Sequence, residues 1–277
     1  MLSFLLPRPH SSPPLLPPPP EPPAGSKLLV ENGECCVYEL ETDTDTDTGH
    51  TLPRVDVVFF HGSSSSTTPK SAWWSTWTSG DSEEFCWPKW LGPQLNARIL
   101  FMCYPAFLDV NDDLTSCWFS QARSLLSQLS DSSVELGKDG RPVILVGHGM
   151  GGLMMKQLLL DAHIDAARGV HHWLPNVRGM VFFATPHRGF PFSSWTASDL
   201  AKIPIFRAVW KKENTDRLAA FNTSITDLTN KFFDLESQLK IIPLCFVEQP
   251  SASLDSSPAR EAYTDHRAPS QRYPFIL

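Results

Sequence analysis

The sequence has 277 residues, of which 42% are hydrophobic, so it can bury the core of one large or two small domains. Its formal net charge is -7, with lysines and arginines scattered along the chain, which argues against a nucleic-acid partner. Six cysteines lie mostly far apart without zinc spacing, so we expect reduced thiols, an intracellular location, and neither a metal nor another cofactor. No apolar run reaches the roughly 18 residues of a spanning helix, so we expect no transmembrane segment.

Residues 1–25 contain ten of the 25 prolines, a composition that favours extended polyproline segments and cannot bury a core. We therefore expect a disordered, proline-rich leader, which could recruit a protein partner of the SH3 or WW class. Its first residues weakly resemble a targeting peptide. The leader carries one arginine, however, and its apolar stretch stops at Pro7, so organellar targeting is the less favoured interpretation.

Residues 26–52 form the second expected unit, with two short strands followed by the acidic loop DTDTDTDTG. The alternating aspartates of this loop resemble the start of an EF-hand calcium loop. The sixth position of an EF-hand loop requires glycine and the twelfth requires glutamate, but Thr48 and Arg54 stand there. We therefore interpret the segment as a solvated loop.

From residue 53 to residue 277 the sequence alternates apolar runs with amphipathic segments, which predicts an α/β domain with a mostly parallel sheet and helices on both faces. Turn residues bound the apolar runs, and we expect strands at 55–62, 97–105, 142–149, 177–186 and 239–248. Apolar residues at helical spacing predict core-facing helices, marked by Leu114, Trp118, Ala122, Leu125 and Leu129 and by Leu218, Phe221, Ile225, Leu228, Phe232 and Leu235. The tryptophans of SAWWSTW and FCWPKWL are expected in the core or in a lid over a pocket.

The sequence GHGMGG after the third of these strands is the strongest functional signal. It has the pattern of a nucleophile elbow, G-x-S-x-G, in which small residues stand where the strand and helix backbones pass close together. Gly149 stands where the nucleophilic serine belongs, and we assign the rest of the elbow to Gly147, His148, Gly151 and Gly152. Because glycine adopts strained turn angles without a Cβ penalty, we expect the turn to form although the reactive oxygen is missing.

The same stretch also matches the dinucleotide fingerprint G-x-G-x-x-G through Gly147, Gly149 and Gly152. That fingerprint belongs after the first strand of its unit, and it needs an acid about 20 residues on, after the second strand. Here two strands precede the motif, and Asp161 and Asp165 come before the next strand. The nucleophile elbow is therefore favoured over a nucleotide site.

His61 and Gly62 end the first strand of this domain. In α/β-hydrolases an HG pair at this place opens the loop that donates one oxyanion-hole N–H, and the residue after the nucleophile donates the second. The two donors here would be the backbone N–H groups of Ser63 and Met150.

Four segments in order extend the comparison beyond one motif: VDVVFFHG, DSEEFCWPKWLGPQLNARILFMCYP, RPVILVGHGMGGLMMKQLLL and VRGMVFFATPHRG. Over about residues 53 to 250, the sequence resembles the serine active site-containing protein family of lipid-metabolising α/β-hydrolase relatives, and it is also similar to GPI inositol-deacylase-like lipases. The resemblance implies an α/β-hydrolase fold and a lipid or acyl-ester ligand. It also implies a location at the periphery of mitochondrial or endoplasmic reticulum membranes.

Members of that family usually carry serine where this chain has Gly149. The resemblance places the acid after the strand that contains IIPLCFVE, at Glu248 with Asp255 as the alternative, and the base at His266. Only eleven residues follow His266, and the usual final helix is absent from them, so we expect a C-terminal end that is truncated or divergent.

The TPHRG loop puts His187 and Arg188 just beyond the carboxyl end of a predicted strand. Open α/β sheets place their sites at this edge, so the two side chains are candidate pocket residues. They could contact an anionic headgroup, although a role in fixing the loop is favoured.

Three functional hypotheses follow. The first is a pseudo-hydrolase that binds a lipid, an acyl ester or a partner, since loss of a triad member leaves only residual catalysis. The second is an active hydrolase or acyltransferase that uses another nucleophile, such as one of Ser63 to Ser66 or Ser194. The third is an adaptor that recruits partners through the proline-rich leader.

Overall fold

The computed structural model describes residues 23–33, 35–41, 52–62, 72–78, 86–105, 114–189 and 215–246. The strands are β1 (Ser26–Asn32), β2 (Cys35–Leu40), β3 (Val55–Phe60), β4 (Ala97–Cys103), β5 (Val143–His148), β6 (Val177–Phe183) and β7 (Ile242–Phe246). The α-helices are α1 (Ala72–Ser75), α2 (Pro88–Leu95), α3 (Leu114–Leu129), α4 (Met150–Asp165) and α7 (Thr215–Leu239). The strands form one sheet in the order β1-β2-β4-β3-β5-β6-β7.

The sheet is mostly parallel, which confirms the expected fold class. From β4 to β7 every neighbouring pair is parallel, and Val58 of β3 is in register with Leu100 of β4 and Leu145 of β5. β1 and β2 are antiparallel to each other, and β2 is antiparallel to β4. The two short strands expected before residue 53 are therefore part of the same sheet as the strands that follow.

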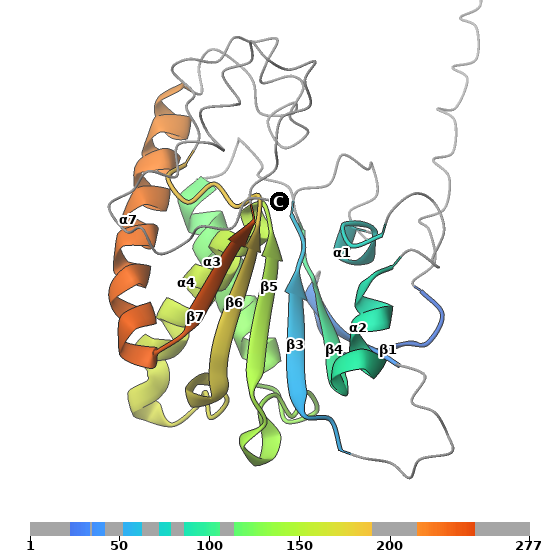
Figure 1. Ribbon diagram of the computed structural model, residues 1–277. Helices are drawn as coiled ribbons and strands as arrows, with labels where there is room; N and C mark the ends of the chain where they lie inside the picture. The colour runs from blue at the N-terminus through green and yellow to red at the C-terminus, as the bar shows by residue number, and fades with distance from the viewer. Residues whose placement is uncertain are drawn as a thin grey trace, which may run out of the picture.

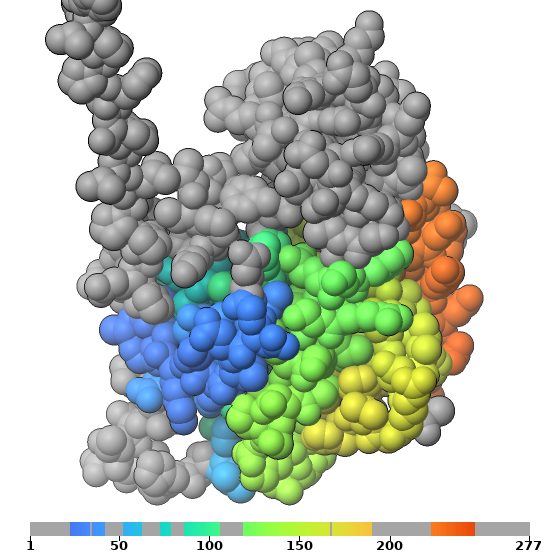
Figure 2. Space-filling model, turned by 180° about the vertical axis from the view of Figure 1, so that it is seen from behind, coloured from blue at the N-terminus to red at the C-terminus, as the bar shows by residue number. Residues whose placement is uncertain are grey.

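Helices cover both faces of the sheet (Figure 1). The helices α3, α4 and α7 pack on one face, against alternate strand residues such as Phe60 and Leu145. The helices α1 and α2 cover the other face, where Phe59 and Phe101 lie. Seen from behind in Figure 2, the strands β1 and β2 (blue) and the helix α7 (orange) lie on opposite sides of the molecule. Successive strand side chains point to opposite faces, so apolar runs with no polar alternation produce two cores.

The tryptophans of SAWWSTW belong to the core on the α1 and α2 face. Trp73, Trp74 and Trp77 are all buried, and Trp77 packs edge-to-face on Phe59 with 5.0 Å between the ring centroids. Trp90 of FCWPKWL is instead 54% exposed on α2. The expectation of core tryptophans is therefore confirmed for the first segment.

Two expected strand boundaries were wrong by three residues, and the others that fall on described residues agree within two residues. The last strand was expected from residue 239, but Leu239 ends α7 and β7 begins only at Ile242. Between them, Lys240 has a φ of 55°, a left-handed conformation that ends a helix. The strand expected at 177–186 ends at Phe183, because the positive φ of Ala184 turns the chain out of the sheet.

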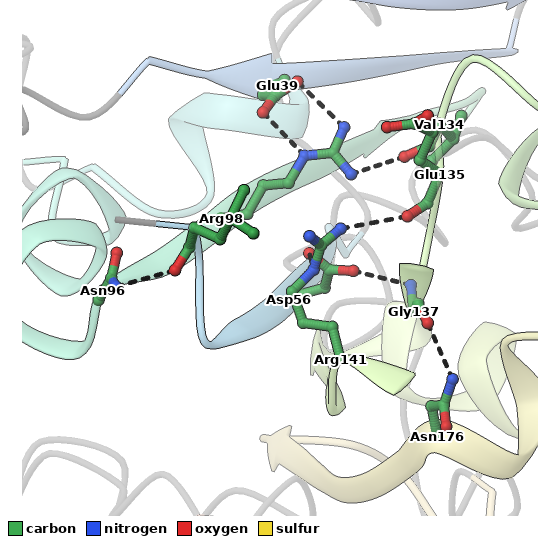
Figure 3. Close-up of polar contacts among 10 residues, drawn as sticks. Glu39, Asp56, Asn96, Arg98, Val134, Glu135, Gly137, Arg141 and Asn176 are labelled. Atoms are coloured by element: carbon green, nitrogen blue, oxygen red, sulfur yellow. Dashed lines mark hydrogen bonds and ion pairs between the residues drawn. The ribbon is translucent and has the colours of Figure 1, made fainter. Parts of the chain in front are cut away.

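A buried ion-pair network fixes the amino-terminal ends of β3 and β4 (Figure 3). Asp56 is fully buried, accepts a hydrogen bond from the Gly137 N–H at 2.8 Å and pairs with Arg141 Nε at 2.7 Å. On β4, Arg98 donates to both carboxylate oxygens of Glu39, at 2.8 and 3.0 Å. The carboxylates of Asp56 and Glu39 lie at the edge of the sheet opposite the carboxyl ends of the parallel strands, where an α/β sheet places its site. We therefore assign this network to stabilising the fold.

We expect Asp56→Asn to lower the free energy of unfolding by about 2 kcal/mol, because a charge-assisted contact to the largely buried Arg141 is lost. Urea unfolding of the two proteins measures the difference. The matched control is Glu135→Gln, which removes an exposed pair with Lys138 at 2.6 Å and should leave stability unchanged. Equal losses in the two variants would contradict the assigned role of the buried pair.

Candidate functional site

Gly149 alone makes the turn between β5 and α4, since β5 ends at His148 and α4 begins at Met150. Its φ of 52° and ψ of -121° mirror those of the first central residue of a type II turn, a region that residues with side chains rarely adopt. The Gly149 N–H donates a hydrogen bond to the Phe183 carbonyl of β6 at 2.8 Å. The strand, turn and helix expected at GHGMGG are therefore present and tied to the sheet.

Close packing excludes side chains at the glycines around this turn. A Cβ on Gly147 would lie 2.7 Å from the Gly152 nitrogen. A Cβ on Gly151 would lie 2.6 Å from the His61 carbonyl oxygen, and one on Gly152 would lie 2.7 Å from Thr185 Cγ2. Contacts this short do not occur for real Cβ atoms, so these three positions require glycine on grounds of space.

Gly149 differs from its neighbours because a Cβ would fit there. Among the residues that the structure describes, the nearest atom it would meet is the Cα of Gly62, at an ordinary contact distance of 3.9 Å. The positive φ is therefore what opposes a side chain at this position, at a typical cost of about 1–3 kcal/mol. The Cβ direction of residue 149 faces the loop that follows β3, where an oxyanion donor was expected.

His61 holds this loop against the sheet. Its Nδ1–H donates to the Gly62 carbonyl at 2.9 Å, and its Nε2 accepts the Tyr104 N–H at 3.4 Å, which assigns the tautomer. The Tyr104 hydroxyl donates to the His61 carbonyl at 2.5 Å, and the two rings stack with 4.1 Å between their centroids. Burial lowers the pKa of His61 to about 4. A neutral, fully buried imidazole with these partners positions the loop.

Met150 is the first residue of the 16-residue helix α4. The N–H groups in the first turn of a helix have no acceptor within the helix, and the helix dipole adds positive potential at that end. The Met150 N–H, one of the two expected oxyanion donors, therefore directly follows the position that a nucleophile side chain would occupy. The other, Ser63, lies outside the described residues.

The expected acid and base also lie outside the described residues. The candidate acids Glu248 and Asp255 and the candidate base His266 are not among the residues that the structure describes. The same is true of the alternative nucleophile Ser194 and of the leader up to residue 22. Their assignments stay predictions. Within the described part of the chain, no group of three or more His, Cys, Asp or Glu side chains could hold a metal ion. Among the described helices, none is long and apolar enough to cross a membrane.

The TPHRG loop is held by contacts with β7 and α7. The His187 carbonyl accepts a hydrogen bond from the Thr229 hydroxyl at 2.6 Å. The imidazole Nε2 of His187 lies 3.6 Å from Cys245 Sγ. The imidazole packs edge-to-face against Phe182 with 4.8 Å between the ring centroids. Arg188 is exposed. These contacts support the loop-fixing role for His187.

Lys156 is a residue of this region that sequence reasoning missed. It lies on α4, is 2% exposed, and donates from Nζ to Thr229 Oγ1 of α7 at 2.9 Å. Its Nζ also lies 5.7 and 5.6 Å from the ring centroids of Phe182 and Phe232. Burial lowers the pKa of Lys156 to about 7. Because Thr229 in turn holds His187, the amine connects α4, α7 and the TPHRG loop. The sequence feature that could have indicated a buried lysine is its place within the apolar run LMMKQLLL.

We expect Lys156→Met to remove a pH dependence of stability. The folded protein releases this proton near pH 7, whereas the ordinary pKa of a lysine in an unfolded chain is 10.5. Between these values the unfolded state binds one more proton, so stability rises with pH by up to about 1.4 kcal/mol per pH unit. Glu236 of α7 and Cys245 of β7 also face the amine, and burial raises the pKa of Cys245 to about 11, above this window.

Urea unfolding between pH 6.5 and 9.5 measures this effect as the stability difference between wild type and variant. The difference should shift in favour of wild type as pH rises. The exposed Lys231 of α7 provides the control, since Lys231→Met should change stability by the same small amount at every pH. A pH-independent difference for Lys156→Met would show that the buried amine does not titrate in this range.

Comparison with known proteins places these features in a family context. A model of the alpha/beta hydrolase family matches residues 57–275. Protein SERAC1 of Danio rerio is 29% identical over 215 residues, which cover 70% of this chain and 30% of that protein. Protein SERAC1 of Homo sapiens is 26% identical over 218 residues, with the same coverage of 70% and 30%. The chain thus spans about 30% of the length of these relatives. The mature lipase BlEst2 of Bacillus licheniformis aligns with a TM-score of 0.46 and 16% identity, over 87% of this chain and 88% of that one.

Proposed function

Because the chain belongs to the alpha/beta hydrolase family, we propose that it is a pseudo-hydrolase, which binds a lipid or acyl ester at the elbow and does not cleave it. The observation that carries the proposal is the contrast among the elbow glycines. Gly147, Gly151 and Gly152 leave no space for a Cβ, whereas Gly149 leaves space for one among the described residues. The turn thus has space for a side chain at residue 149, where a nucleophile elbow carries its serine, and glycine supplies none.

The chemistry of the elbow favours binding without turnover. With no hydroxyl at residue 149, no acyl intermediate forms there, and a histidine base has no nucleophile to activate. The Met150 N–H and the positive end of α4 are still in place to bind the carbonyl oxygen of an ester. The lipid or acyl-ester class of ligand is the one that the resemblance to the serine active site-containing family implies, as is an action at the periphery of mitochondrial or endoplasmic reticulum membranes.

Equilibrium binding of a fluorescent medium-chain acyl ester tests this proposal. We expect saturable binding to wild type by fluorescence anisotropy, competition by an unlabelled acyl trifluoromethyl ketone, and no released acid by chromatography beyond the buffer rate. Release of acid by wild type would overturn the pseudo-hydrolase assignment, and absence of saturable binding would overturn the binding role.

Two variants at one position locate the bound ester. Gly149→Ala and Gly149→Leu carry the same backbone cost, but only leucine fills the space beside Gly62. We therefore expect Gly149→Leu to weaken binding at least about tenfold relative to Gly149→Ala, through steric exclusion that leaves the fold unchanged. Equal affinities of these two variants would place the ligand away from the elbow.

A further inference from the structure

Two cysteines face each other across neighbouring strands. Cys36 of β2 and Cys103 of β4 are direct partners in the antiparallel register. Their side chains belong to the same core cluster, on the face covered by α1 and α2. The two thiols are in hydrogen-bonding contact. These strands are far apart in the sequence, so only the fold brings the thiols together.

The strand register sets a Cα spacing that a disulfide can span. Directly opposed residues of antiparallel strands have Cα atoms about 4.5 or 5.5 Å apart. Disulfides bridge Cα atoms about 4.4–6.8 Å apart, so the spacing that this register gives lies within the range a disulfide spans. The adjacent Cys35 faces the opposite side of the sheet and belongs to the other core cluster. It is therefore not in position to compete for Cys103.

The pair is buried, but each residue keeps a small exposed fraction. Cys36 and Cys103 are 7% and 8% exposed, and the thiol of Cys36 also forms a hydrogen bond with the exposed Glu31 of β1. Burial raises the pKa of the Cys36 thiol, so little thiolate is present at neutral pH and exchange is slow. The hydrogen bond with Cys103 favours the thiolate and acts in the opposite direction.

We propose that Cys36 and Cys103 form a redox modification site, a dithiol that a low-molecular-weight disulfide such as oxidised glutathione converts into a cross-strand disulfide. The Cys36 thiolate, its proton released to water, attacks one sulfur of the oxidant, and one glutathione thiolate leaves. The Cys103 thiolate then attacks the Cys36 sulfur of the mixed disulfide, and the second glutathione thiolate leaves. The two cysteines lose two electrons and two protons, and the oxidant becomes two glutathione thiols.

The bond would form beside the candidate site. Cys103 is followed directly by Tyr104, whose hydroxyl and N–H both hold His61. A disulfide here closes a long loop between β2 and β4, and such a link stabilises the folded state mainly by restricting the unfolded chain. Oxidation should therefore raise the melting temperature and fix the strand end that supports the loop facing Gly149.

Equilibration of the folded full chain in glutathione redox buffers tests the proposal. After acid quenching, the protein is unfolded, alkylated with N-ethylmaleimide and mapped by peptide mass spectrometry. The reduced chain has six cysteines, so the oxidised form should carry four alkylated thiols and one Cys36–Cys103 linked peptide. Its melting temperature should be higher than that of the reduced form, and dithiothreitol should reverse both changes.

Single cysteine variants provide the controls. Cys36→Ser and Cys103→Ser should each abolish the linked peptide and the rise in melting temperature. Cys86→Ser, which alters a buried thiol on the same sheet face, should leave both in place. Six alkylated thiols in the most oxidising buffer, a link through Cys35, or only separate glutathione adducts would each overturn the proposal. The wild-type peptide map decides the matter even where a serine variant does not fold.

Discussion

Gly149→Ser should give a protein that hydrolyses short-chain esters on the order of 10³-fold faster than wild type. In serine hydrolases with complete triads, loss of the nucleophile costs about 10⁶ in turnover, so restoring it alone has room for a gain of this size. The backbone at residue 149 already makes the sharp turn with its positive φ, and among the described residues an added Cβ would meet nothing closer than the Cα of Gly62 at 3.9 Å. Initial rates with a p-nitrophenyl ester measure the gain.

Companion variants separate the nucleophile from the rest of the machinery. Gly149→Ala carries the same backbone cost without a hydroxyl and should stay inactive. Adding His266→Ala or Glu248→Gln to Gly149→Ser should remove the gain, and Asp255→Asn tests the alternative acid in the same way. If Gly149→Ser is as stable as Gly149→Ala and no more active, the elbow is not a dormant catalytic centre.

Gly151→Ala should lower the free energy of unfolding by more than ~3 kcal/mol. Overpacking of a core costs about 1–3 kcal/mol when side chains can move aside. Here the added Cβ would overlap the backbone carbonyl of Phe60 and lie 2.6 Å from that of His61, so β3 and α4 themselves must separate. Urea unfolding measures the loss. Gly149→Ala is the control, with a loss of about 1–3 kcal/mol that comes from its φ alone.

The same substitution also tests the link between packing and activity. In the Gly149→Ser background, Gly151→Ala should abolish the gained esterase rate even at temperatures where the double variant is still folded, because the elbow is displaced. A double variant that keeps its rate would show that the close approach of β3 and α4 does not position residue 149.

Most strands could be predicted because the pattern that defines them is local. A run of apolar residues bounded by turn residues indicates a strand buried on both faces, and β3, β4, β5 and β6 all follow it. The start of β7 could not be placed this way. Apolar residues continue from the end of α7 into the strand, and the turn at Lys240 carries no glycine to mark it. The antiparallel pairing of β2 with β4 joins distant segments, which no local pattern encodes.

The turn between β5 and α4 could be predicted from its glycines, but which of these glycines exclude a side chain could not. Whether a Cβ fits at Gly149 or Gly151 depends on His61 and Gly62, which follow β3 and lie far away in the sequence. Lys156 was missed for a related reason. A lysine on a helix normally reaches solvent, and its burial here depends on Thr229, 73 residues later in the chain. Local sequence thus identifies the turn, and tertiary packing decides what each position tolerates.

The most direct test of the account is the mapping of fluorophosphonate adducts on wild type and Gly149→Ser under identical conditions. The account predicts no adduct on wild type and a single stoichiometric adduct at position 149 of the variant, found by peptide mass spectrometry. An adduct on a serine of the wild-type chain, such as Ser63 or Ser194, would contradict it by identifying an active nucleophile elsewhere.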